Sequence, residues 1–365
     1  MKVLLLGGTG TLSRAVLEEA LSNDIKVSIL NRGLHNNNLS KEVHVIKGDF
    51  YAPSNWRDSV VKENYDVVVD FLSRTSDDIE RVYPIFKDCC KQYIFISSAC
   101  VYRRSKEDFP IKEISPKPNM NWSYNTEKYE SELKLRELAA NAKSYFTIVR
   151  PYITYNDERI PIGIAPAYKY HRMLVERIKA GKPWFVWDDG SAITTVTYVA
   201  DFAVGLVGLF LNEKAKNEDF HITGDFSYTQ NQLVEKLFLK LNVPINVVHI
   251  PASDIASILP EYKGLLLGDR ALDASFDNSK IKAAVPQLCF KTSLDQGLDY
   301  ILANLVKSKP QYDYIFEARI DKLISKYKKG ISFVCYPEAN KKSHLIYLLF
   351  RYFPYKIALR LKKCL

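Results

Sequence analysis

Short apolar runs alternate along the first half of the chain with segments in which apolar residues recur at helical spacing. The apolar runs occupy Lys2–Leu6, Val27–Leu30, Val43–Ile46, Val67–Phe71, Tyr93–Ser97 and Phe146–Val149. Between the first two runs, Ser13–Leu21 carries apolar residues at the spacing of a crossover helix. Strands that alternate with helices form a parallel sheet with helices on both of its faces. The pattern therefore predicts a doubly wound α/β domain.

The second half of the chain is predicted to be shared between that domain and a smaller one. Thr194–Val199 and Asp219–Thr223 are β-like, and we expect them to rejoin the main sheet. Pro161–Ala180 and Gln230–Leu298 are mostly helical. The resulting assignment gives residues 1–155 and 186–228 to the sheet domain, 156–185 and 229–308 to a mostly helical substrate domain, and 309–365 to a C-terminal extension.

The first apolar run leads directly into a glycine-rich turn and then into the first predicted helix. Gly7 and Gly10 permit a tight turn and a close approach of the backbone to a ligand. The free N–H groups at the helix start, around Thr11 and Leu12, attract phosphate. Ser13 stands where a third glycine is usual, and its side chain is small enough to be tolerated there. The segment predicts a site for the pyrophosphate of a dinucleotide.

The end of the second predicted strand bears on which dinucleotide is bound. NAD sites place an acidic residue there to hold the ribose 2′-hydroxyl. The sequence of residues 30–33 has no acid but contains Arg32, which can pair with a 2′-phosphate. NADP(H) is therefore favoured over NAD(H), unless Arg32 is simply a solvated loop residue. Asp49, after the third predicted strand, is a candidate acceptor for the adenine amino group or else an ordinary turn residue.

Tyr124 and Lys128 are four residues apart in a charged amphipathic segment, residues 124–140, which is predicted to be a helix. One helical turn puts both side chains on the same face. Free tyrosine is a poor base at neutral pH because its pKa is about 10. A neighbouring ammonium group favours the phenolate. Together with the glycine-rich turn, this pair predicts a nicotinamide-dependent oxidoreductase in which Tyr124 exchanges the proton of a substrate hydroxyl.

Over roughly residues 1–305 the chain resembles an extended short-chain dehydrogenase/reductase, a family that contains sugar-nucleotide epimerases and dehydratases. The matching elements are Gly7-x-x-Gly10, Asp49, Ser97-Ser98-Ala99-Cys100-Val101-Tyr102, Tyr124-x-x-x-Lys128, Arg150-Pro151 and Val199-Ala200-Asp201. The resemblance implies a Rossmann domain in which Ser98 is the catalytic serine. It also implies that Lys128 holds the nicotinamide ribose and that Phe71 and Pro151 belong to the cofactor site.

Two departures from the family narrow the expected reaction. The 4,6-dehydratases follow their catalytic serine or threonine with Asp-Glu, whereas Ala99 and Cys100 follow Ser98 here, which argues against dehydration. Epimerases often carry an arginine in the region corresponding to residues 189–196 to hold the substrate diphosphate, and this chain has none there. We expect reduction of a carbonyl of a nucleotide-linked sugar in the synthesis of surface polysaccharide precursors. A sugar-nucleotide epimerase with tightly bound NAD is the alternative.

A third interpretation comes from a divergent branch of the same family, the chloroplast stem-loop-binding type. Residues 31–33 and 276–282 resemble that branch, in which the catalytic tyrosine is often lost and some members bind RNA. This chain keeps Tyr124 and Lys128, and its first 330 residues are nearly neutral. We therefore expect an enzyme that binds a nucleotide-linked sugar and no nucleic acid. A homodimer is left open.

The net charge of +9 is concentrated at the C-terminal end. Residues 331–365 contain seven Lys/Arg and one acid, so they contribute +6, and the preceding residues contribute +3. Two short amphipathic segments, separated by Pro354, combine these cations with Tyr, Phe and Leu. Such a tail either packs on the body of the protein or on a second subunit, or contacts an anionic membrane surface. No apolar run approaches the ~20 residues needed to cross a bilayer.

The six cysteines and six histidines show no spacing typical of metal ligands. The cysteines are interpreted as reduced thiols, and the expected location is the cytoplasm, with membrane association through the tail as an open question. No metal is expected.

Overall fold

The computed structural model describes residues 1–37, 39–307, 309–333, 336 and 339–363, and the chain divides into two compact units. The first unit comprises Met1–Asn156, Thr195–Ser227 and Ala274–Ser293; the second comprises Asp157–Thr194, Tyr228–Asp273 and Leu294–Leu365. The segment Ala274–Ser293, grouped with the substrate domain from its sequence, lies in the first unit because its apolar side chains, among them Ile281 and Phe290, enter that unit's core.

A seven-stranded parallel sheet forms the centre of the first unit. Its strands, in spatial order, are β11 (Glu218–Ile222), β6 (Tyr145–Pro151), β5 (Cys90–Ile96), β4 (Tyr65–Asp70), β1 (Lys2–Leu6), β2 (Lys26–Asn31) and β3 (His44–Lys47). The chain moves outward from β1 through β2 to β3 and then returns to β4 on the other side of β1. Ligands of such sheets bind where the strand order reverses, beyond the carboxyl ends of the strands. The predicted doubly wound α/β fold is confirmed.

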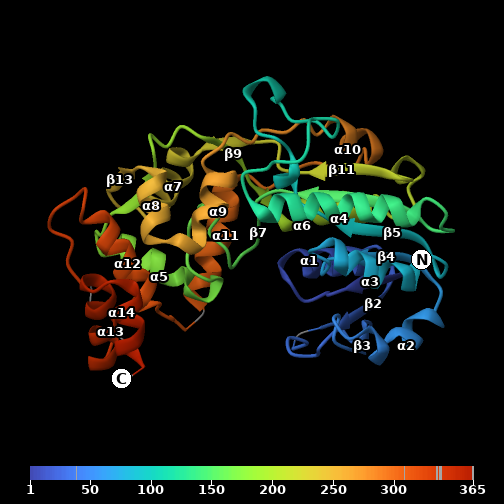
Figure 1. Cartoon of the computed structure of the whole chain (residues 1–365), viewed down its shortest axis with the longest axis horizontal. Coiled ribbons are helices and arrows are strands. Elements are labelled where there is room, and N and C mark those ends of the chain that lie inside the picture. Colours follow the sequence, from blue (N-terminus) through green and yellow to red (C-terminus); the bar gives the residue numbers. More distant parts are fainter. Residues whose placement is uncertain (38, 308, 334–335, 337–338, 364–365) are drawn as a thin grey trace. The chain divides into compact units, whose positions relative to one another are not determined.

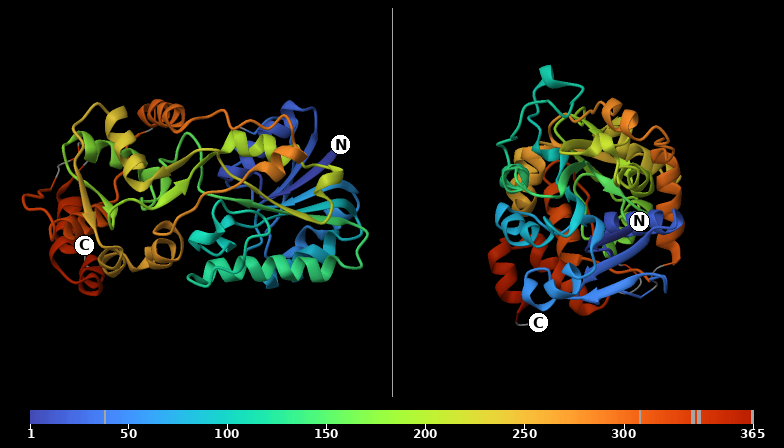
Figure 2. Two further views of the ribbon diagram at one scale, coloured as in Figure 1. Left: turned by 90° about the horizontal axis from the view of Figure 1, so that it is seen from above. Right: turned by 90° about the vertical axis from the view of Figure 1, so that its right-hand side faces the viewer.

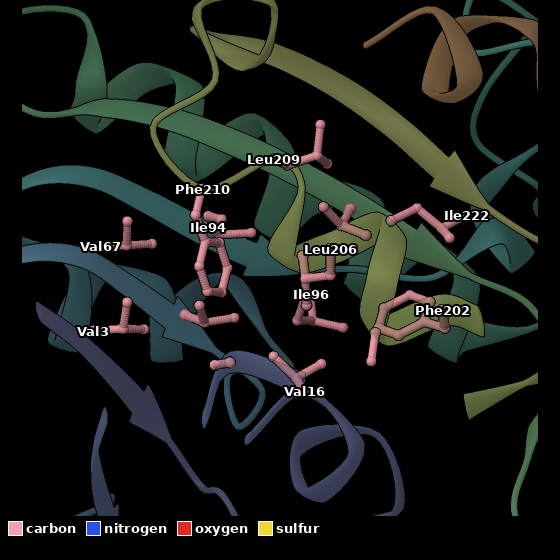
Figure 3. Packing of buried hydrophobic residues seen from close by; sticks show 14 of the residues in the cluster. Val3, Val16, Val67, Ile94, Ile96, Phe202, Leu206, Leu209, Phe210 and Ile222 are labelled. Atoms are coloured by element: carbon pink, nitrogen blue, oxygen red, sulfur yellow. The ribbon is translucent and has the colours of Figure 1, made fainter. Parts of the chain in front are cut away.

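Helices cover both faces of this sheet (Figure 2). The helices of the first unit are α1 (Thr11–Ser22), α2 (Arg57–Val61), α3 (Ser76–Phe86), α4 (Ser123–Ala139), α6 (Val199–Val207) and α10 (Ser279–Ala284). On one face, α1 and α6 pack on the strands, and Figure 3 shows Phe202 and Leu206 of α6 beside Val16 of α1 and the strand residue Ile96. On the other face, Ile79 and Val82 of α3 and Leu135 of α4 fill a second apolar layer with the alternate strand residues.

The prediction that Thr194–Val199 rejoins the main sheet is wrong, whereas Asp219–Thr223 does so as β11. The former segment contains two short strands, β9 (Ile193–Thr195) and β10 (Thr197–Tyr198), outside the seven-stranded sheet. The β10 strand pairs instead with β7 (Thr154–Tyr155), just beyond the end of β6. Two or three β-prone residues fix neither the partner nor the sheet, which explains the error.

The second unit is mostly helical around one pair of parallel strands. Its helices are α5 (His171–Lys179), α7 (Gln230–Lys240), α8 (Ala252–Ile258), α9 (Lys263–Leu265), α11 (Leu294–Lys307), α12 (Tyr314–Ile324), α13 (Lys341–Tyr352) and α14 (Tyr355–Lys362). The strand pair is β8 (Trp184–Trp187) with β13 (Val247–Ile250), and β12 (Ser227–Thr229) begins at the unit boundary.

The two amphipathic segments of the tail are α13 and α14, separated at Pro354 as predicted. Tyr347, Phe350 and Ala358 are buried in one cluster with Ala318 of α12, so the tail packs on α12 within the second unit (Figure 1). In the part of the chain that the structure describes, no helix has the length and apolar character that a membrane span requires.

Candidate dinucleotide and catalytic site

The glycine turn between β1 and α1 has a backbone that other residues would strain. Gly7 and Gly8 have φ angles of 116° and 98°. A Cβ atom on Gly8 would lie 2.6 Å from the side chain of Ile29, so this glycine also lets the turn pack against β2. Ser13 is buried and its Oγ accepts the N–H of Gly10 at 3.0 Å, which explains how serine replaces the usual glycine.

Four other predicted cofactor residues lie at the same edge of the sheet as this turn. Thr11 and Leu12 begin α1, where backbone N–H groups have no partner within the helix and can face phosphate. Phe71 directly follows β4, and its Cβ lies 3.7 Å from the position a Cβ of Gly7 would occupy. Pro151 ends β6, two strands further along the sheet. Because Gly7 has no Cβ, a ligand can approach the backbone of this turn closely, as the predicted pyrophosphate site requires.

The turn after β2 gathers cations near the predicted position of the adenosine ribose. Arg32 is exposed directly after the strand. The Asn31 side chain shapes the turn, because its Oδ1 accepts the N–H of Gly33 at 2.8 Å and its Nδ2 donates to Asn36. Lys47, the last residue of β3, is in register with Asn31, and its aliphatic chain lies beside Gly33. Lys47 is thus a second cation at this end of the sheet.

Asp49 lies two residues beyond β3 and is exposed. One carboxylate oxygen accepts the N–H of Tyr51 at 3.0 Å, and the backbone carbonyl of Asp49 accepts the indole N–H of Trp56 at 2.8 Å. Asp49 therefore makes an ordinary Asx turn. Its other carboxylate oxygen could still accept the adenine amino group, and this role stays a prediction.

Tyr124 and Lys128 lie one turn apart near the start of α4. Tyr124 is half-buried, with its ring centroid 4.8 Å from that of Trp122. Lys128 is buried, and its Nζ donates to the carbonyls of Ser73 at 2.7 Å and Ile96 at 3.0 Å. Burial lowers the pKa of Lys128 to about 8. Because an ammonium group has three N–H donors, a third remains for a ligand hydroxyl after these two described contacts.

Asp70, at the end of β4, holds the loop that supplies one of those carbonyls. Its side chain is fully buried and accepts the N–H groups of Leu72 and Ser73, the hydroxyl of Ser73, and the hydroxyl of Tyr93 at 2.6 Å. These hydrogen bonds hold the loop after β4 in place, and with it the Ser73 carbonyl that accepts from Lys128. Asp70 was not predicted as a functional residue, although an acid within the apolar run Val67–Phe71 is a visible signal.

Ser98 follows β5 by two residues and is buried. Its Oγ accepts the N–H of Cys100 at 3.2 Å and caps the short turn Ala99–Val101. Oγ is the acceptor in this contact, so the hydroxyl proton of Ser98 is not used in it. The strand itself ends at Ile96, earlier than the predicted apolar run to Ser97.

The neighbouring Ser97 joins the end of β5 to the helix that carries Tyr124 and Lys128. Its Oγ donates to Glu132 at 2.6 Å, and Glu132 lies one turn beyond Lys128 on α4. Arg150 of β6 donates to both oxygens of Glu132 at 2.8 and 2.7 Å, and all three side chains are buried. A buried bidentate pair of this kind fixes orientation as well as distance. Glu132 was not predicted as a functional residue, and its only signal in the sequence is its helical spacing from Lys128.

Among the described residues, no group of three or more His, Cys, Asp and Glu side chains is arranged to hold a metal ion.

One curated relative is similar to the chain in sequence. The chloroplast stem-loop binding protein of 41 kDa b from Arabidopsis thaliana is 27% identical over 239 residues. The match covers 61% of this chain and 59% of the plant protein, so the chain spans less than two thirds of that relative.

Solved structures of sugar-nucleotide epimerases share the fold at low sequence identity. UDP-glucuronic acid 4-epimerase from Bacillus cereus, in complex with UDP-glucuronic acid and NAD, has a TM-score of 0.67 and is 17% identical over 84% of this chain and 99% of its own. UDP-glucose 4-epimerase from Thermus thermophilus, in complex with NAD, has a TM-score of 0.64 and is 14% identical over 85% of this chain and 100% of its own.

Membership of a family follows from sequence and fold together. The sequence model of the NAD dependent epimerase/dehydratase family matches residues 3–223, more than half of the chain. That stretch contains the glycine turn, Ser98, and the Tyr124 and Lys128 pair, and the sheet around them has the strand order that a dinucleotide-binding fold requires. The resemblance seen in the sequence is confirmed, and the chain belongs to the NAD dependent epimerase/dehydratase family.

Proposed function

We propose that this protein is an NADP(H)-dependent reductase of a carbonyl in a nucleotide-linked sugar. The observation that carries the proposal is the cationic end of β2 and β3, where Arg32 and Lys47 lie beside the turn after β2. Two cations there suit the 2′-phosphate of NADPH, whereas an NAD site is expected to present a carboxylate to the 2′-hydroxyl. A role in surface polysaccharide precursor synthesis follows from family resemblance alone.

A bound nicotinamide would supply the hydride in this reaction. Tyr124 then donates its phenolic proton to the carbonyl oxygen of the substrate, and Ser98 donates a hydrogen bond to the same oxygen. Lys128 follows Tyr124 by one turn of α4, and its positive charge would favour the phenolate left after proton transfer. Its remaining N–H is suited to a ribose hydroxyl of the cofactor. Gly7, Gly10, Thr11 and Leu12 would hold the pyrophosphate.

A preference for NADPH favours a reductase over an epimerase, because the two enzymes use their cofactor differently. A reductase consumes its cofactor and gains from selecting NADPH, which cells hold in the reduced form. An epimerase regenerates its bound cofactor in every cycle and gains little from that choice. Ala99 and Cys100, where dehydratases carry Asp-Glu, leave no acid–base pair after Ser98 for the removal of water.

Two alternatives have specific observations in their favour. A sugar-nucleotide epimerase would use the same Ser98, Tyr124 and Lys128, and the fold is shared with epimerases whose structures contain NAD. RNA binding is suggested by the name of the plant relative, a stem-loop binding protein. Against it, the sequence outside 322–365 has 40 Lys/Arg and 41 Asp/Glu, so this part of the chain carries no net positive charge to attract RNA.

Denaturing the purified full-length protein and identifying the released nucleotide separates the two enzymes. A reductase should release little nucleotide, and the purified protein should bind NADPH more tightly than NADH in a fluorescence titration. Retained NAD at one equivalent per chain would overturn the reductase in favour of the epimerase. The same titration with an RNA hairpin, at two salt concentrations, tests the third alternative.

A further inference from the structure

The net positive charge of this protein comes entirely from one C-terminal segment. Residues 322–365 contain 11 of the 51 Lys/Arg and only one of the 42 Asp/Glu. The remaining 321 residues therefore have 40 basic and 41 acidic side chains, a net charge of −1. The proposed reaction gives no reason for this asymmetry, because the candidate cofactor and catalytic residues all lie before residue 152.

Helix α12 holds the cationic parts of this segment together. Lys322 of α12 donates its Nζ to the carbonyl of Phe353 at 2.9 Å. Arg351 donates to the hydroxyl of Ser325, one residue after α12, at 3.0 Å. The lysines from residue 322 to 329 and the basic end of the tail therefore belong to the same region of the second unit, where Figure 1 shows α13 and α14 beside α12.

Helix α13 buries Tyr347 and Phe350 and α14 buries Ala358, and other apolar side chains at the end of α13 and along α14 stay exposed. Phe350 and Ala358 face the cluster with α12. Tyr352 is 70% exposed and Ile357 is 46% exposed, and Phe353, Leu359 and Leu361 are also exposed. Lys356, Lys362 and Lys363 are exposed among them. We call this set, residues 352–363 without the buried Ala358, the tail surface.

We propose that the tail surface binds an anionic phospholipid membrane. Exposed aromatic and aliphatic side chains interleaved with Lys and Arg match the boundary between lipid headgroups and acyl chains, where each cation also gains from the negative surface potential. No acid lies on α13 or α14 to oppose this charge. A nucleic acid would use the cations, but it offers no partner for exposed aliphatic side chains such as Ile357 and Leu361.

The test is co-sedimentation of the full-length protein with vesicles. Vesicles of phosphatidylcholine and phosphatidylserine should pellet the protein, and vesicles of phosphatidylcholine alone should not. High salt should weaken the binding. The triple variant Lys356→Glu, Lys362→Glu, Lys363→Glu should lower the partition coefficient at least about tenfold. A double variant, Tyr352→Ser with Ile357→Ser, keeps the charge and should also weaken binding.

A matched charge control separates the tail surface from net charge. Lys62→Glu, Lys87→Glu and Lys143→Glu together make the same change in charge at exposed lysines of the first unit. This control should bind vesicles nearly as well as the unaltered protein, and all variants should keep the circular dichroism spectrum and NADPH affinity.

Several results would overturn the proposal. Equal losses in the two triple variants would assign the binding to bulk charge, and failure to pellet with phosphatidylserine would leave no membrane binding. If the double variant abolished a dimer in analytical ultracentrifugation without vesicle binding, a second copy of the chain would cover this surface. Binding of an RNA hairpin that is lost in the tail triple variant, without vesicle binding, would identify RNA as the partner.

Discussion

Tyr124 and Lys128 share a helix face but differ in their contacts, and each can be removed separately. The variant Tyr124→Phe loses the proton donor and keeps the ring beside Trp122. We expect kcat to fall about 10²- to 10⁴-fold in steady-state assays, with cofactor affinity nearly unchanged. Tyr129→Phe, five residues along α4, is the control and should keep normal turnover. Near-normal turnover of Tyr124→Phe would exclude Tyr124 as the acid–base group.

Burial of Lys128 is expected to make the stability of the folded protein depend on pH. Its pKa is about 8 in the folded protein, because of burial, and about 10.4 in an unfolded chain. Between these values the unfolded chain binds more protons, so raising the pH stabilises the folded protein, by up to about 3 kcal/mol.

The variant Lys128→Met lacks this titration. In urea unfolding without cofactor, the free energy of unfolding of the unaltered protein should therefore rise relative to that of Lys128→Met between pH 8 and 10. Lys143→Met, which removes an exposed ammonium, should show no such difference from the unaltered protein. Parallel pH profiles for the protein and Lys128→Met would contradict the burial argument.

The cofactor preference can be tested at one residue. Arg32→Glu would place a carboxylate against the 2′-phosphate of NADPH, so NADPH affinity should weaken by at least about 2 kcal/mol, while NADH affinity is kept or improved. Lys26→Glu makes the same charge change at the opposite end of β2 and should leave both affinities unaltered. If Arg32→Glu weakened the two cofactors equally, Arg32 would have no part in distinguishing them.

Among the helices, α12 is attached to the rest of the second unit by buried ion pairs. Arg177 and Lys182 both contact Glu317 and Asp321 of α12, and all four side chains are buried. Removing one carboxylate leaves two buried cations with a single counterion, which is costly even though an intact buried pair adds little net stability.

Glu317→Ala should therefore lower the free energy of unfolding by about 3–5 kcal/mol in urea titrations. Asp295→Ala, which breaks the half-exposed pair between α11 and Lys236 of α7, should cost no more than about 1 kcal/mol. A similar small loss for both variants would mean that α12 is held by apolar packing alone.

Elements whose signal is local could be predicted from the sequence, and contacts between distant segments could not. The run Lys2–Leu6 is β1, and the predicted helix 124–140 corresponds to α4 within one residue at each end. The Ser97 to Glu132 bond spans 35 residues and the Lys128 to Ser73 bond spans 55. Such contacts depend on which strands are neighbours, and apolar periodicity does not specify that order.

At the scale of the whole molecule, the chain crosses repeatedly between its two units. Ala274–Ser293 returns to the first unit although its neighbours on both sides belong to the second. Its helical apolar pattern predicts a helix but not the core that the helix joins, so only the folded structure reveals the assignment. The uneven distribution of charge, by contrast, can be predicted from the sequence. The structure adds which side chains of the tail are buried against α12 and which stay exposed.

If turnover consumes the reduced cofactor, the near-UV absorbance of NADPH must fall as product forms. Purified full-length protein is mixed with NADPH and a panel of nucleotide-linked ketoses and 4-keto sugars, and product is measured in parallel. For a reductase we expect the absorbance to fall in proportion to the product formed. Product formed at constant absorbance, without added cofactor, would contradict the reductase and favour the epimerase.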